Sequence, residues 1–219
     1  FSELSNIIES TSNIVNQDAL NRGLSDEDLG VADKTITAKS YKELIILFMS
    51  LGMDRMVDFN NSLCRWSPSN EKVMQMYGMQ AIPMVWDFAE ANPIGNSVGS
   101  WLNTMDYISK CIDTIHPNQV VPGIAEQRSA EDTMNSTESI IVSTDPPYYN
   151  NIEYADLSDF FYVFLRKNVK HIYPDLFKTV LTPKSSELVA SPFRFDGDMS
   201  KAKKHFENGF IRAFKSIKK

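Results

Sequence analysis

Apolar residues recur at helical spacing through most of the first half of the chain. Residues 2–20 carry isoleucine, leucine and valine on one face, which predicts a first helix. A second helix is predicted to begin at Ser40, where Glu43 completes a capping box. Residues 21–39 are acidic and lack a sustained period, so they predict a surface loop. Further helices are predicted on either side of Pro83, a helix-breaking residue, at 70–77, 86–91 and 100–115.

The pattern changes after residue 116. Residues 118–125 hold β-branched side chains and a proline, which predicts a short or edge strand. Residues 138–144 form a short apolar run, and this predicts a strand buried on both faces. Two prolines end that run, and an amphipathic helix capped by Asp156 is predicted to follow them. Strand, rigid turn and helix together predict part of a parallel α/β unit, with one more helix at 200–217.

Composition and charge narrow the class of protein. No apolar run approaches the ~18 residues needed to cross a bilayer. Cys64 and Cys111 lie far apart and predict buried thiols in a reducing compartment, so we expect a cytoplasmic protein. The three histidines are scattered, and no metal site is expected. Residues 1–163 hold 9 basic and 23 acidic side chains, whereas residues 164–219 hold 13 and 5. A basic end is typical of a protein that meets a polyanion, although a solvated basic helix gives the same count.

The clearest chemistry lies in Ser143–Asn151, a stretch that reads Ser-Thr-Asp-Pro-Pro-Tyr-Tyr-Asn-Asn. Asp145 offers carboxylate oxygens at the end of the predicted strand, and the residue before a proline favours extended geometry. Pro146 and Pro147 donate no backbone hydrogen bonds, which leaves a stiff loop rich in free acceptors. Tyr148 adds a flat ring with a polar tip. A planar ligand that carries an amino group, such as a nucleobase, matches this set. A rigid Pro-Pro turn closed by an Asx bond is the structural alternative.

The same stretch resembles the catalytic motif of the amino-methyltransferases that modify adenine, and sometimes cytosine, in DNA with S-adenosylmethionine. Its extension to Arg166 is similar to a large prokaryotic group of adenine-specific DNA methylases with a DUF1156-type N-terminal region, which implies a role in restriction–modification or phage defence. The resemblance covers about residues 38–212, and it implies an α/β fold with a partial Rossmann-like methyltransferase core at 117–219 after a largely helical region at 1–116. Three further segments match the same group in its order: 61–66, 80–93 and 181–190.

The resemblance also implies roles for individual residues. Asp145 accepts a hydrogen bond from the target amine, and the Pro146 carbonyl accepts another. Tyr148 stacks on a base that has been flipped out of the duplex, and Pro147 completes the catalytic motif. For Lys184, the alternative to a substrate contact is a local pair with Glu187. For the lysines at 201–204, the alternative to a phosphate contact is a solvated helix face. The remaining positions implied are substrate-binding Tyr149, Asn150, Asn151 and Lys184, cofactor-binding Asp132 and Thr144, and DNA-phosphate contacts at Lys201, Lys203 and Lys204.

One part of the family's pattern is missing from this chain. The family binds S-adenosylmethionine at a Gly-rich turn, yet none of the nine glycines here forms a Gly-x-Gly pair. We therefore expect an internal piece of a longer enzyme, with an incomplete cofactor site and no activity alone. Its expected partners are DNA and the missing N-terminal part of the same protein. No association with a membrane is expected. The alternatives are a cytosine-amine or RNA-base methyltransferase, and a non-catalytic DNA-binding or scaffold subunit.

Overall fold

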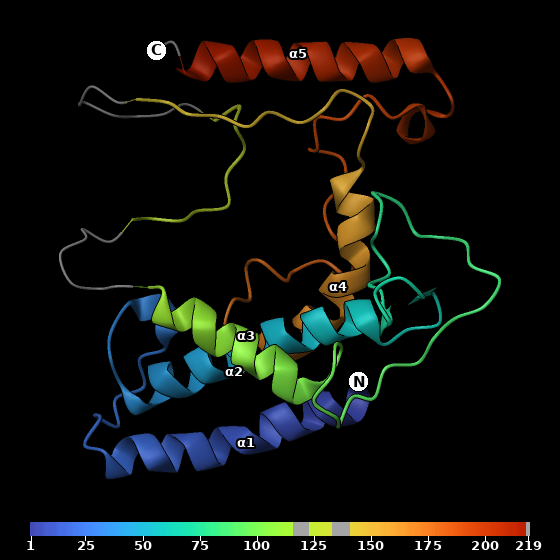
Figure 1. Cartoon of the computed structure of the whole chain (residues 1–219). Coiled ribbons are helices and arrows are strands. Elements are labelled where there is room, and N and C mark those ends of the chain that lie inside the picture. Colours follow the sequence, from blue (N-terminus) through green and yellow to red (C-terminus); the bar gives the residue numbers. More distant parts are fainter. Residues whose placement is uncertain (116–122, 133–140, 218–219) are drawn as a thin grey trace. The chain divides into compact units, whose positions relative to one another are not determined.

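The computed structural model describes residues 1–115, 123–132 and 141–217. About half of the structure is helical, and the only sheet of the described residues has two short strands. Within these segments, no helix combines the length and the apolar character that a bilayer crossing requires. The elements in chain order are α1 Ser2–Asn21, η1 Val31–Asp33, α2 Ala38–Phe59, β1 Trp66–Ser67, β2 Lys72–Val73, α3 Trp101–Asp113, α4 Tyr154–Val169, η2 Pro192–Phe195 and α5 Met199–Ile217, where η denotes a 3-10 helix (Figure 1).

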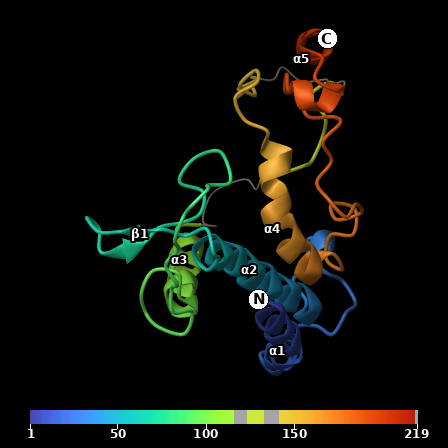
Figure 2. The same ribbon diagram turned by 90° about the vertical axis from the view of Figure 1, so that its right-hand side faces the viewer.

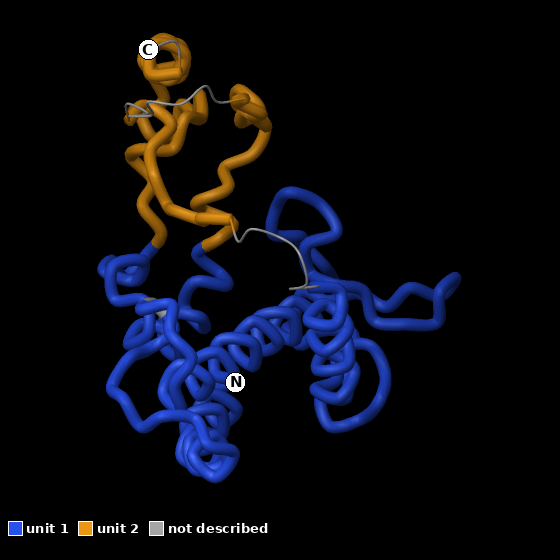
Figure 3. Tube along the Cα trace, turned by 90° about the vertical axis from the view of Figure 1, so that its left-hand side faces the viewer, with its two compact units in different colours: residues 1–121, 159–181 blue, residues 122–158, 182–219 orange. Residues whose placement is uncertain are grey.

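The chain divides into two compact units (Figure 3). The first unit comprises residues 1–121 and 159–181, and the second comprises residues 122–158 and 182–219. Helix α4 is shared, because its first turn groups with the second unit and the rest with the first. The predicted division at residue 116 stays a prediction.

The core of the first unit lies where helices α1, α2 and α4 meet. Ile8, Met53 and Val57 are almost fully buried there, together with Val169 at the end of α4. Burial of each such side chain stabilises the folded state by roughly 1.5–3 kcal/mol, so this cluster carries much of the unit's stability. Both long helices predicted for this region are confirmed, because a periodic apolar face of about 20 residues specifies a helix strongly.

The N-cap of helix α2 lies three residues earlier than the sequence predicts, at Thr37 and not at Ser40. The Thr37 hydroxyl oxygen accepts a hydrogen bond from the Ser40 amide, and the Thr37 amide donates one to the Ser40 hydroxyl oxygen. Glu43 therefore does not complete the predicted capping box. Its carboxylate accepts a hydrogen bond from the Val31 amide at 2.7 Å, and this bond connects η1 to α2.

The predicted helices at 70–77 and 86–91 are wrong. Residues 72–73 form β2, which pairs with β1 in an antiparallel hairpin with Trp66 opposite Val73 (Figure 2). The Met76 amide donates to the Asp58 carbonyl, and the Ala89 amide donates to the Cys64 carbonyl. These long-range backbone bonds replace helical ones, so tertiary contacts override a weak local period. Cys64 is buried beneath this hairpin, whereas Cys111 is exposed, so the prediction of buried thiols holds for Cys64 alone.

The predicted buried strand at 138–144 is not found in its described part. Residues 141–144 pair with no other strand among the described residues, and Ile141 is 100% exposed. Residues 138–140 and most of the predicted strand at 118–125 lie outside the described residues, and 123–125 form no strand. A strand buried on both faces requires neighbours on each side, which this part of the chain does not supply. The α/β core thus stays a proposal, and the described residues are about half helical with one two-stranded hairpin.

In the second unit, helix α5 packs its small residues against the loop that follows residue 182. Ala202 and Gly209 are buried on one face of α5. A Cβ atom on Gly209 would overlap the Leu188 side chain and lie 3.1 Å from its Cγ. The glycine therefore permits a close approach that any larger side chain would disturb.

We expect the substitution Gly209→Ala to destabilise this packing. The overlap with Leu188 should cost about 1–3 kcal/mol, which exceeds the roughly 1 kcal/mol gained from helix propensity. Urea denaturation should show a lower midpoint for this variant. Gly123→Ala is the control, because no atom of the described residues lies within 4 Å of a Cβ at Gly123. A Gly209→Ala variant more stable than the wild-type chain would contradict the packing described here.

Candidate functional site

The segment Asp145–Asn151 forms a turn on the surface of the second unit, and we call it the proline corner. Asp145 and Pro146 are exposed, and Pro147 is half-buried. The Tyr148 ring is 56% exposed. The Asn151 amide donates to the Tyr148 carbonyl at 2.9 Å and closes the turn. The acceptors and the ring that the sequence singles out therefore stand open to solvent rather than beneath other chain.

Two contacts anchor this corner at Tyr149. Its carbonyl accepts a hydrogen bond from the Ala190 amide at 2.8 Å. Its ring meets Phe206 of α5 edge-on, with centroids 5.0 Å apart and an interplanar angle of 84°. Ile152, just beyond the corner, is buried. Tyr149 thus holds the corner against its own unit, while the neighbouring Tyr148 leaves its ring available to a ligand.

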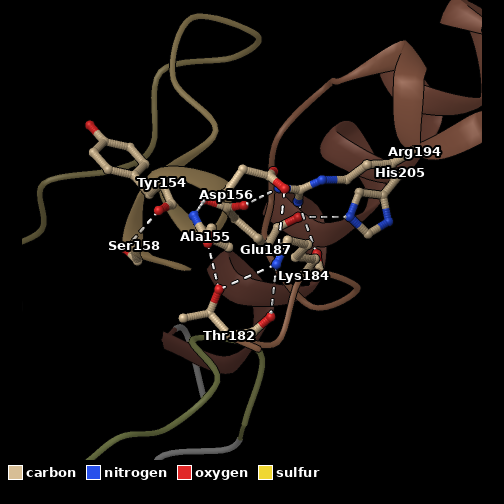
Figure 4. Close-up of polar contacts among 9 residues, drawn as sticks. All are labelled: Tyr154, Ala155, Asp156, Ser158, Thr182, Lys184, Glu187, Arg194 and His205. Atoms are coloured by element: carbon tan, nitrogen blue, oxygen red, sulfur yellow. Dashed lines mark hydrogen bonds and ion pairs between the residues drawn. The ribbon is translucent and has the colours of Figure 1, made fainter. Parts of the chain in front are cut away.

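A charged cluster joins the first turn of α4 to the loop at 182–190 and to η2 (Figure 4). Arg194 places one guanidinium nitrogen 2.6 Å from a carboxylate oxygen of Asp156 and 2.6 Å from one of Glu187. Its other terminal nitrogen donates to the Lys184 carbonyl at 2.9 Å. The side chains of Arg194 and Glu187 are only 17% and 16% exposed. Burial lowers the pKa of the Arg194 guanidinium, but its hydrogen bonds to the two carboxylates outweigh that effect and raise the pKa above its ordinary value.

Lys184 belongs to this cluster and not to an open surface. Its ammonium lies 4.0 Å from Asp156 and donates to the Thr182 carbonyl at 3.3 Å. Glu187 pairs with Arg194, and its amide donates to the Lys184 carbonyl at 3.2 Å, while a pair between the Lys184 and Glu187 side chains stays a prediction. His205 of α5 completes the cluster through a 3.1 Å hydrogen bond to the Glu187 carbonyl (Figure 4). A contact of Lys184 with substrate stays a prediction, and it would compete with these internal bonds.

A cavity of about 440 Å³ opens beside the proline corner. Its size falls within the range of small-molecule sites. Glu131 at its edge is held by two bonds from Arg212, at 2.6 and 2.8 Å, which lower the pKa of the Glu131 carboxyl. Apolar and polar groups both contribute to its walls, which are formed by Gln127, Arg128, Ser129, Ala130, Glu131, Pro147, Pro183, Ser186 and Leu188.

Asp132 and Thr144 are the two residues predicted to bind S-adenosylmethionine. Asp132 and Thr144 are both exposed, and neither contributes to the walls of the cavity beside the corner. The Asp132 amide donates to the Ser129 carbonyl within a simple turn. The sequence contains no Gly-x-Gly pair, and the incomplete cofactor site stays a prediction.

The three lysines predicted to contact phosphates lie in the first two turns of α5. Lys201 pairs with Asp198, and Lys203 pairs with Glu207, at 3.6 and 3.7 Å. Lys204 is exposed. Exposed ion pairs of this kind contribute little and exchange readily with solvent, so they leave both lysines able to approach a phosphate. The phosphate role stays a prediction.

Sequence reasoning missed Arg194. It lies 38 positions from Asp156 in the sequence, and no local motif predicts that the two residues pair. Asp156 was expected only as the cap of its helix, yet Glu187 supplies the hydrogen bond to the Ala155 amide in the first turn. The sole signal in the sequence is the presence of Asp156, Lys184 and Glu187 in segments that resemble the same family.

Comparison of the chain with protein-family models, with curated proteins and with solved structures finds no match in any of the three.

Proposed function

We propose that this chain forms the base-binding side of a DNA methyltransferase that uses S-adenosylmethionine and modifies the exocyclic amine of adenine. The observation that carries the proposal is the exposed proline corner. It presents the Asp145 carboxylate, the Pro146 carbonyl and the open Tyr148 ring on one short turn. A cavity of ligand size adjoins it. The resemblance of the corner to the catalytic motif of such enzymes supplies the reaction class.

The corner suits an amine conjugated to a ring. The lone pair of such an amine is delocalised, so the amine becomes nucleophilic only when its hydrogens are held out of the ring plane. Asp145 and the Pro146 carbonyl would accept these two hydrogens, while Tyr148 stacks on the base. A target inside a duplex has its amine paired and must be extruded first. Positioning and fixed acceptors then provide most of the rate, because the ring-conjugated amine needs little help from a general base at neutral pH.

The cofactor enters this proposal only as the donor of the methyl group. Its binding by Asp132 and Thr144 stays a prediction, and neither residue lines the cavity beside the corner. The chain's own contribution is to bind the flipped base, fix the direction of its amine and keep the ring stacked. Methylation by such an enzyme would serve to distinguish host DNA from phage DNA.

The proposal is tested by methyl transfer in the natural protein that contains this chain. We expect labelled methyl groups from S-adenosylmethionine to enter DNA and to appear, after digestion to nucleosides, as N6-methyldeoxyadenosine. Label in N4-methyldeoxycytidine or in RNA would instead identify one of the two alternative substrates. Absence of any transfer, with DNA binding intact, would show a non-catalytic binding subunit.

A further inference from the structure

We infer that Arg194 is a positioning residue for the proline corner and acts on it through Glu187, Asp156 and the loop at 182–190. The consequence for base binding rests on the proposed function, whereas the structural coupling stands on the contacts of the second unit alone. The three hydrogen bonds of Arg194 reach Asp156, Glu187 and the Lys184 carbonyl and not the corner itself, so its influence on the corner would be indirect.

The first step is the fixation of the loop. Arg194 makes three short bonds, to Asp156, to Glu187 and to the Lys184 carbonyl. Two carboxylates that face one guanidinium repel each other when it is removed. Loss of one member of such a half-buried network costs more than loss of an exposed pair, because the remaining charges keep their desolvation. The loop would therefore lose its fixed conformation without Arg194.

The second step connects this loop to the start of α4. The Glu187 carboxylate accepts from the Ala155 amide at 3.2 Å, and Thr182 donates to the Ala155 carbonyl. A free amide at a helix start favours a negatively charged acceptor, so Glu187 replaces a local cap. Ala155 lies four residues after Asn151, the last residue of the corner. The ion pair with Arg194 thus fixes the exit of the corner.

The third step connects the same loop to the corner itself. Ala190 lies three residues beyond Glu187, and its amide donates to the Tyr149 carbonyl at 2.8 Å. The loop therefore holds the chain at two points, Tyr149 and Ala155, on either side of Ile152. Because the backbone is short between these points, a change in the loop must alter the turn that presents Tyr148.

Hydrogen exchange of individual amides, measured by NMR on the 219-residue chain, tests the coupling. With Arg194→Met we expect exchange to accelerate by about tenfold or more at the amides of Asn151, Ala155 and Ala190, since each bond depends on the loop. If Arg194→Met folds poorly, Glu187→Gln is the second variant that tests the coupling. It keeps an acceptor for Ala155 but loses the ion pair, so Asn151 and Ala190 should still exchange faster. Arg212→Met is the matched control, because it removes an exposed pair with Glu131 in the same unit.

Acceleration confined to Ala155 would overturn the inference, since it would leave the corner unaffected. Unchanged exchange at all three amides would overturn it as well. Acceleration at Asn151 and Ala190, absent in the Arg212 control, supports it whether or not the chain binds DNA.

Binding of an eight-residue oligodeoxyadenylate with a central 2-aminopurine then tests the consequence for the base. A change in 2-aminopurine fluorescence on binding reports that the base has left its stack on the neighbouring adenines or has stacked on a ring such as Tyr148. Arg194→Met should weaken oligodeoxyadenylate binding by about tenfold and leave oligodeoxythymidylate, which has no exocyclic amine, within about twofold. Equal binding of both oligonucleotides by the wild-type chain would overturn the proposed function, and the exchange data would still decide the coupling. Preferential adenylate binding that Arg194→Met leaves intact would overturn the positioning role alone.

Discussion

Replacement of Asp145 by alanine is expected to lower methyl transfer to DNA by about 10²–10³-fold in the natural protein that contains this chain. The carboxylate lies exposed at the start of the proline corner, where it would accept a hydrogen of the target amine. Alanine offers no acceptor, so the amine would no longer be held out of the ring plane. Transfer of labelled methyl groups and protection of the product DNA from a restriction endonuclease both measure the loss.

Two variants separate this effect from a general loss of structure. Asp145→Asn keeps the volume and one acceptor oxygen, so its methyl transfer should fall less than that of the alanine variant. Asp175→Ala removes another exposed carboxylate, one that pairs only with Lys178 in the first unit, and should leave transfer unchanged. Full methyl transfer by Asp145→Ala would remove the basis for the proposed chemistry.

The parts of the fold that the sequence predicts well are those with a long local signal. Helices α1, α2 and α5 each have about 20 residues, so their apolar periods are read over five turns. The short predicted helices failed because the segment around Met76 forms backbone bonds to Asp58 and beyond, which no local period encodes. Residues 141–144, the described part of the strand predicted at 138–144, form no strand for a related reason: a short apolar run is buried only where neighbouring strands cover it.

The candidate site also has a part that the sequence predicts and a part that it does not. The proline corner is visible in the sequence because proline and tyrosine constrain their own backbone and surroundings, whatever the rest of the chain does. The cluster around Arg194 is invisible, because its three acidic and basic partners are brought together only by the loop after Thr182. A charged residue in a sequence has many possible partners, and pairing is decided by tertiary structure. The supporting contacts of a site are therefore harder to predict than the groups that would touch its ligand.

Asp54 leads to a second large expected effect, on stability and not on activity. It lies on α2 and is only 9% exposed, and among the described residues its Oδ1 atom has no hydrogen-bond partner. Burial raises the pKa of this carboxyl to about 8. The unfolded chain binds the same proton with a pKa of about 3.9. Since the folded state holds the proton more tightly, the contribution of Asp54 to the free energy of unfolding is fully present below pH ~4 and is lost as the pH rises through about 8.

Urea denaturation at pH 4.5 and pH 8.5, followed by circular dichroism, measures this loss. Between these values the wild-type chain should lose roughly 2–5 kcal/mol through Asp54, and Asp54→Asn should remove most of that dependence. Asparagine keeps the shape and carries no charge, so the variant should be the more stable chain at pH 8.5. Asp106→Asn, at an exposed position on α3, should leave the pH dependence unchanged. An Asp54→Asn chain that loses stability with pH as steeply as the wild type would show that this carboxylate is solvated in the folded protein, and the packing of α2 would then need a water-filled opening beside it.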